Sequence, residues 1–227
     1  MKLLFIRHGE PDYDNDCLTP HGREQAAMLR DRLAATEHID AAFASPMGRA
    51  SQTAQICMEN TGISVEVCPW LREFDVKIHD PGSSGMIYAW DMSPKYRESI
   101  LCDREKYISS PYIQDTEMSG RYCAADEGLD RILAGYGLVR EGDRYRKTAE
   151  CGETLAFFCH FGMTCVLVSK LLGVSPIPIL NGLSCEPTGI TTMCTDDRFG
   201  EYVGFRMHGY GDISHLSGHV SCGNIFK

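Results

Sequence analysis

The chain has 227 residues, of which 43% are hydrophobic and 23% are charged, as expected for one compact soluble domain and not for a disordered tail or a fibre. Its longest apolar runs, such as residues 3–6, are far shorter than the roughly 20 residues needed to span a bilayer. A formal net charge of −9 disfavours nucleic acid and anionic lipid surfaces as partners. With no export signal readable at the N-terminus, we expect a cytoplasmic protein that binds neither a membrane nor nucleic acid.

The eleven cysteines do not predict a disulfide scaffold. Their number is odd, and several lie in apolar runs, as Cys57, Cys159 and Cys165 do. No two cysteines are separated by two residues, so the usual sequence signal of a structural zinc site is absent. We therefore expect reduced thiols and no bound metal.

The first 70 residues alternate apolar runs with signals for helix starts. Thr19 can cap a helix whose first position is Pro20, and Ser45 followed by Pro46 repeats this signal. The second of these helices is expected to stop near Gly62. The predicted strands of this part are residues 2–6, 39–44 and 63–67. The first helix is predicted at about residues 20–35.

The rest of the chain is harder to assign between residues 74 and 152. Two helices are expected there, near 88–107 and 124–136. Residues 155–159 predict a second buried strand, followed by a helix through Leu172. Two further strands are expected at residues 189–195 and 202–207.

Strands that alternate with helices predict an α/β fold of three layers, a largely parallel sheet flanked by helices. We expect a single domain over residues 1–227, with a helical cap insertion at about 75–150. His8 and His160 each follow a buried strand directly. Because sites in such folds form beyond the carboxyl ends of the strands, the two imidazoles should meet above one sheet edge if their strands are neighbours.

Arg7 and Arg49 are of the residue type that phosphoryl chemistry requires. A phosphoryl group in transfer spreads negative charge over three oxygens, so its site needs convergent cations and an in-line nucleophile. Arginine forks can hold phosphate oxygens in bidentate fashion. Arg49 also lies in the first turn of a predicted helix, where free backbone N–H groups and the helix dipole favour an anion.

Five short motifs follow one another in the order and spacing of a known family. They are Arg7-His8-Gly9, residues 18–26 (LTPHGREQA), residues 45–54 (SPMGRASQTA), Leu71-Arg72-Glu73 and His160-Phe161-Gly162. Together they resemble the histidine phosphatase superfamily, also called the phosphoglycerate mutase-like family. The resemblance covers almost the whole chain and is thin from about 75 to 150.

The resemblance implies roles for five polar residues. His8 would be the nucleophile and form a phosphohistidine, which water then discharges. His160 would donate to a phosphoryl oxygen, and Glu73 would protonate the leaving group. Arg7 and Arg49, together with His160, would bind the phosphate.

Other polar and aromatic residues leave alternatives open. Glu10 and Asp75 are alternatives to Glu73 as the proton donor. In the insertion, Tyr88, Trp90 and Tyr96 would be either walls of the site or the insertion's own small core. Arg97 or Arg104 would be an anchor for a second anionic group. His215 is interpreted as a packing residue. The histidines expected to be solvated or structural are His21, His38, His79, His208 and His219.

Two departures from the family pattern bear on the activity. Asp14 stands where phosphoglycerate mutases usually carry an asparagine, and residues 74–77 replace the Arg-His pair and Gly-Gly turn of the mutases. Both changes weaken the mutase interpretation. We therefore expect a metal-independent phosphomonoesterase of the histidine acid phosphatase type, which transfers a phosphoryl group from a small phosphate ester to His8 and then to water.

Two alternative functions remain. One is a phosphoglycerate mutase, an isomerase that keeps the phosphate; the other is a non-catalytic module that binds a phosphorylated ligand. The expected partner is a small phosphorylated substrate, and no cofactor is expected. The oligomeric state is left open, with a homodimer among the options.

Overall fold

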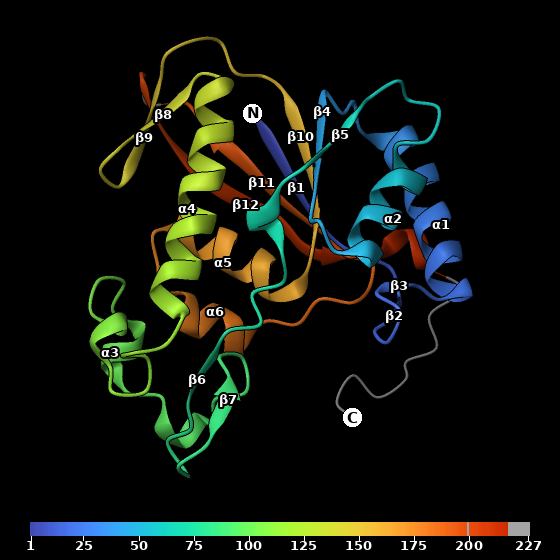
Figure 1. Ribbon diagram of the computed structural model, residues 1–227. Helices are drawn as coiled ribbons and strands as arrows, with labels where there is room; N and C mark the ends of the chain where they lie inside the picture. Colours follow the sequence, from blue (N-terminus) through green and yellow to red (C-terminus); the bar gives the residue numbers. More distant parts are fainter. Residues whose placement is uncertain (199, 218–227) are drawn as a thin grey trace.

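Three layers make up the fold (Figure 1). In this computed structural model an eight-stranded sheet lies between two pairs of helices. One face of the sheet is covered by α1 (Pro20–Thr36) and α2 (Gly48–Cys57), and the other by α4 (Met118–Gly135) and α5 (Phe161–Leu172). The predicted α/β class is confirmed.

The structure describes residues 1–198 and 200–217. Residue 199 and residues 218–227, His219 among them, lie outside the described part of the chain. Within that part, none of the helices combines the length and hydropathy needed to cross a membrane.

The sheet is mixed, with the strand order β5-β4-β10-β1-β11-β12-β9-β8. The parallel half consists of β5 (Val65–Val67), β4 (Ala41–Ala44), β10 (Thr154–Cys159) and β1 (Lys2–Arg7). The antiparallel half consists of β11 (Ile190–Asp196), β12 (Tyr202–Asp212), β9 (Arg144–Lys147) and β8 (Leu138–Glu141). The parallel arrangement thus holds for the half that carries both histidines.

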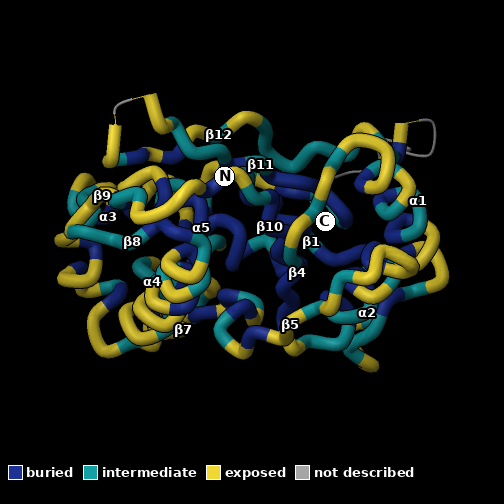
Figure 2. Tube along the Cα trace, turned by 90° about the horizontal axis from the view of Figure 1, so that it is seen from above, coloured by how far each residue is buried: buried dark blue, intermediate teal, exposed yellow. Residues whose placement is uncertain are grey.

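Successive residues of β1 face opposite layers of the protein. Leu3 and Phe5 pack in the cluster that contains residues of α4 and α5, whereas Leu4 and Ile6 pack with residues of α1 and α2. All four side chains are buried, and Figure 2 shows the buried trace running through the centre of the molecule. The continuous apolar run of this strand is explained by this double coverage, which also fixes the position of its carboxyl end.

Residues 75–150 contain less helix than expected. The helix predicted near 88–107 is wrong: Tyr88 ends the strand β7 (Met86–Tyr88), which pairs with β6 (Lys77–His79). Pro94 lies inside the predicted helix, where it removes an N–H donor and disfavours the helical conformation of the residue before it. Only short helical turns follow, η2 (Pro94–Tyr96), α3 (Ser99–Cys102) and η3 (Tyr107–Ser109).

Two further differences concern helix starts. The helix expected from 124 begins earlier, at Met118. Helix α2 begins at Gly48 and not at Pro46, and the side chain of Met47 in the cap position makes no capping hydrogen bond. Ser45, which resembled a cap, uses its hydroxyl elsewhere, as described below. A single domain with a cap over residues 75–150 stays a prediction.

Candidate active site

His8 and His160 lie side by side at the carboxyl ends of two neighbouring strands. Strands β1 and β10 are parallel and paired in register, with Arg7 opposite Cys159, so the next residue of each chain segment is a histidine at the same edge. The two ring centroids are 5.1 Å apart, with the ring planes at 63°. Both side chains are buried, at 2% and 0% exposure. The prediction that the imidazoles meet at one sheet edge is confirmed.

Hydrogen bonds determine which nitrogen of His8 carries the proton. Nδ1 lies 2.7 Å from the carbonyl oxygen of Gly9, which can only accept, so Nδ1 is the donor. Nε2 therefore holds a lone pair, and it accepts from Arg49 Nε at 3.2 Å. Burial, followed by the positive charges of Arg7 and Arg49, lowers the pKa of His8 to about 3, although the Gly9 hydrogen bond opposes this shift. The ring is therefore neutral over the physiological pH range.

His160 is held through its other nitrogen. Its Nε2 lies 2.7 Å from Ser45 Oγ, and Ser45 Oγ also accepts from the backbone N–H of Met47 at 3.2 Å. The serine proton is then free to point at Nε2, which leaves the histidine proton on Nδ1. Burial and the neighbouring ring and guanidinium groups hold the pKa of His160 well below its usual value.

Buried donors without partners gather at this edge. Three buried side-chain polar atoms in residues 1–198 and 200–217 lack a hydrogen-bond partner, and two of them are Arg7 Nε and His160 Nδ1; the third is Glu153 Oε2. Arg7 Nη1 is occupied, because it donates to the carbonyl oxygen of Cys185. Unpaired buried donors are costly, so two of them beside His8 favour an anionic ligand.

Glu73 reaches the site from the loop after η1 (Pro69–Leu71). Its Oε1 accepts from the backbone N–H groups of Phe74 at 2.7 Å and Met163 at 3.1 Å, so it sits on the first turn of α5 beside His160. A β carbon on Gly162 would lie 2.8 Å from this oxygen, which is why glycine is needed there. Burial raises the pKa of Glu73, against the effect of the two N–H groups.

The alternatives to Glu73 are engaged elsewhere. Glu10 accepts from Thr19 Oγ1 at 2.8 Å at the start of α1. Asp75 is exposed and pairs with Arg121 at 3.3 Å. Of the three carboxyl groups, Glu73 is thus the one with a raised pKa and with a contact to the helix that follows His160.

The residues considered in the insertion divide into two groups. Trp90 lies against Gly162, because a β carbon there would be 2.8 Å from its ring, and it stacks on Tyr88 at 5.0 Å. The two arginines have partners outside the residues assigned to the site: Arg97 donates to the backbone carbonyl of Met92, and Arg104 pairs with Asp143.

Two residues that support the histidine strand lack a clear sequence signal. The backbone N–H of Thr188 donates to the carbonyl oxygens of both Arg7 and His8 at 3.1 Å, from a left-handed conformation with φ of 61° that is rare for a β-branched residue. Its hydroxyl contacts His215 Nε2 at 2.9 Å, so His215 makes a polar contact in addition to packing. A positive φ at threonine cannot be read from the sequence.

We predict that the protein loses stability as the pH falls below about 6.5. Unfolded histidine binds a proton near that pH, whereas His8 and His160 stay neutral in the fold, so the unfolded chain binds more protons. Each of the two should lower the free energy of unfolding by about 1.4 kcal/mol per pH unit, down to about pH 3 for His8. Urea unfolding of the wild type and of His8→Asn between about pH 6.5 and 5 gives the free energy of unfolding as a function of pH. Equal slopes of this free energy against pH in the two proteins would contradict the prediction.

Comparison with known proteins shows which family the N-terminal part of the chain is similar to. Residues 3–83 match the profile of the histidine phosphatase superfamily (branch 1). This segment contains Arg7, His8, Arg49 and Glu73. This part of the chain is thus similar to the histidine phosphatase superfamily. A curated relative, the probable phosphoglycerate mutase GpmB of Enterobacter sp. (strain 638), is 31% identical over 87 residues, which are 34% of this chain and 40% of the relative.

Solved structures share the fold of this chain over most of its length. Phosphoserine phosphatase from Entamoeba histolytica, in complex with 3-phosphoglyceric acid, has a TM-score of 0.61 at 20% identity and covers 95% of this chain and 98% of its own. Mycobacterial glucosyl-3-phosphoglycerate phosphatase with VO3 has a TM-score of 0.59 at 18% identity, covering 92% and 98%. The α-ribazole phosphatase of Shigella flexneri has a TM-score of 0.59 at 17% identity, covering 94% and 97%.

Proposed function

We propose that this protein is a phosphomonoesterase that transfers the phosphoryl group of a small phosphate ester to Nε2 of His8 and then to water. The observation that carries the proposal is the neutral, buried His8, whose Nε2 lone pair faces Arg49 and whose neighbours Arg7 and His160 have unpaired buried donors. A nucleophile next to convergent cations is what phosphoryl transfer needs.

The first step forms a bond between His8 Nε2 and phosphorus and breaks the bond to the ester oxygen. Arg49 Nε, which donates to Nε2 in this structure, donates to a phosphoryl oxygen once a phosphoryl group is bound and so exposes the lone pair. Glu73 in its protonated form gives its proton to the leaving oxygen, which its raised pKa favours. The proton on Nδ1 of His8 stays on that nitrogen throughout, hydrogen-bonded to the carbonyl oxygen of Gly9.

The second step returns the site to its starting state. Glu73, now ionised, takes a proton from the attacking water as the oxygen bonds to phosphorus and the bond to Nε2 breaks. His8 leaves as a neutral ring, which its lowered pKa favours. Arg7, Arg49 and Nδ1–H of His160 stabilise the negative charge of the transferring group in both steps.

A phosphoglycerate mutase is the second candidate, because the curated relative that is 31% identical over 87 residues has that name. Hydrolysis is favoured over the mutase reaction, since Asp14 and residues 74–77 depart from the mutase pattern. The metal-independent mechanism is part of the same proposal, because Arg7, Arg49 and the Nδ1–H donor of His160 can already stabilise the charge on the phosphoryl oxygens. The substrate is proposed as a class, small phosphate esters.

We predict that the protein releases inorganic phosphate from a panel of small phosphate esters, phosphoserine and 3-phosphoglycerate among them, and that a chelator leaves the rate unchanged. Free phosphate and isomerised product are measured in the same reaction. Isomerised product without phosphate would support the mutase. Thermal stabilisation by phosphate esters without any turnover would support a binding module, and a rate abolished by chelator and restored by magnesium would contradict the metal-independent mechanism.

A further inference from the structure

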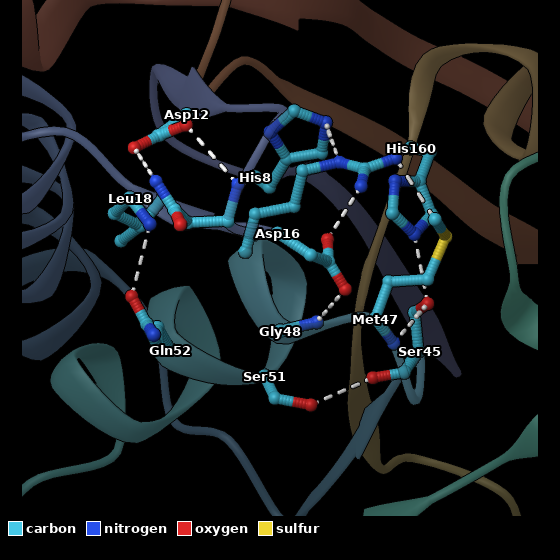
Figure 3. Close-up of polar contacts among 12 residues, drawn as sticks. His8, Asp12, Asp16, Leu18, Ser45, Met47, Gly48, Ser51, Gln52 and His160 are labelled. Atoms are coloured by element: carbon cyan, nitrogen blue, oxygen red, sulfur yellow. Dashed lines mark hydrogen bonds and ion pairs between the residues drawn. The ribbon is translucent and has the colours of Figure 1, made fainter.

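The loop between β2 (Pro11–Asp12) and β3 (Cys17–Leu18) carries an acidic residue to the start of α2. Asp16 Oδ1 accepts from Arg49 Nη1 at 2.6 Å, and its Oδ2 accepts from the backbone N–H of Gly48 at 2.7 Å (Figure 3). A β carbon on Gly48 would overlap the backbone carbonyl of Asp16, so the loop can approach the helix only at a glycine. The anion at this helix terminus is thus one of the protein's own carboxylates.

The loop itself is held in one conformation. The carboxylate of Asp12 accepts from the backbone N–H groups of Asp14 at 3.1 Å and Asn15 at 3.2 Å and from Asn15 Nδ2 at 2.8 Å. Asp16 follows with a φ of 45°, a left-handed conformation that aspartate tolerates better than most residues. Its carboxylate is therefore presented to Arg49 in a defined position.

The atoms of Arg49 have separate partners. In a guanidinium group Nε–H and Nη2 lie on one edge, and Nη1 is not part of that edge. Nε donates to His8 Nε2 at 3.2 Å, Nη2 lies 3.6 Å from Met47 Sδ, and Asp16 takes Nη1. The edge formed by Nε and Nη2 thus faces His8, and because a thioether is a weak acceptor, a phosphoryl oxygen can take over Nη2.

Burial and charge agree with this division of the guanidinium group. The side chain of Arg49 is 7% exposed and that of Asp16 is 45% exposed, so the arginine is buried while its counter-ion keeps contact with water. Burial acts to raise the pKa of Asp16, but the hydrogen bonds from Gly48 and Arg49 outweigh it and lower that pKa. Tyr13 covers the same guanidinium group, with its ring centroid 5.3 Å from Arg49 Cζ.

We propose that Asp16 is a positioning residue of the phosphate site: it holds Nη1 of Arg49 so that the Nε and Nη2 edge stays directed at the phosphoryl group on His8. This inference rests on the proposed function. Asp16 acts through Arg49 and not on substrate, and its loss lets the arginine side chain leave its productive orientation.

The test is a double-mutant cycle of Asp16→Ala and Arg49→Ala, with kcat/KM for a phosphate ester and the dissociation constant of orthovanadate as readouts. Asp16→Ala should lower kcat/KM by about 10- to 100-fold and weaken vanadate binding. In the Arg49→Ala background the same substitution should change either quantity by less than about twofold. Asp16→Asn, which keeps an oxygen acceptor, should fall between the wild type and Asp16→Ala.

Asp14→Ala is the matched control, because it removes the same charge from the same loop at an exposed side chain, whereas the carboxylate bound to Arg49 is that of Asp16. It should leave vanadate binding within about twofold of the wild type. Equal effects of the two aspartate substitutions would overturn the proposal in favour of a general field effect. An undiminished effect of Asp16→Ala without Arg49 would also overturn it, as would tighter vanadate binding, which would make Asp16 a competitor of the anion.

Failure of the proposed function is distinguishable from failure of this inference. A wild type that hydrolyses no phosphate ester contradicts the function, whereas calorimetric titration with vanadate still measures the coupling between Asp16 and Arg49. Thermal unfolding of each variant separates a loss of folded protein from a loss of coupling, since a merely structural role of Asp16 would persist in the Arg49→Ala background.

Discussion

Replacement of His8 by alanine is expected to lower kcat by about 10⁴-fold or more, because it removes the nitrogen that accepts the phosphoryl group while water cannot reach the same position with comparable reactivity. Arg7, Arg49 and His160 remain in this variant. Vanadate and phosphate should therefore still bind, with their affinity measured by calorimetry, and initial rates on a phosphate ester give the loss in kcat.

His8→Asn provides a second variant in case the alanine leaves a cavity that the fold does not tolerate. An asparagine can keep a donor for the Gly9 carbonyl, yet it offers no nucleophilic nitrogen at Nε2. Both variants should unfold cooperatively and lack turnover. Full activity in a folded His8 variant would show that His8 is not the nucleophile.

The second large effect is expected from Glu73→Gln. Glutamine keeps an oxygen that can accept from Phe74 and Met163, so the local structure should persist, but it cannot donate a proton to the leaving group. We expect kcat/KM to fall by about 10² to 10⁴-fold for an alkyl phosphate, whose alkoxide is a poor leaving group. The kcat/KM for an aryl phosphate should fall much less, because its aryloxide can leave without being protonated.

The same substitution should change the pH profile. Because the pKa of Glu73 is raised and that of His8 is lowered, the wild type should keep its kcat/KM on the acid side and lose it as Glu73 ionises at higher pH. Glu73→Gln should abolish the alkaline loss. Equal losses of kcat/KM on alkyl and aryl esters, or an unchanged alkaline limb, would assign the proton donor to another group.

Much of the fold follows from local sequence patterns in the parallel half of the sheet. The apolar run of β1 and the similar run of β10 could be predicted as buried strands because both of their faces are covered, and the histidine after each strand then falls at a common edge. The order of strands in the antiparallel half depends on contacts far apart in the chain. Residues 138–147 do carry a local hairpin signal, the two-residue turn Gly142-Asp143 between β8 and β9, but the pairing of this hairpin with β12 depends on distant contacts.

The supporting residues of the site were less predictable than the reacting ones. Ser45 followed by a proline resembles a helix cap, and only the tertiary structure places its hydroxyl 2.7 Å from His160 Nε2. Asp16 lies 33 residues from Arg49 in a loop without periodicity. Such contacts depend on how loops fold back on the sheet, so short-range patterns cannot indicate them.

The most direct test of the central claim is mass spectrometry of the protein quenched at alkaline pH during turnover, where phosphohistidine is stable. We predict one phosphoryl group on the peptide that contains His8, located on the imidazole, and none on the same peptide of His8→Asn. A phosphoryl group on any other residue, or phosphate release without a covalent species in a rapid-quench time course, would contradict the account.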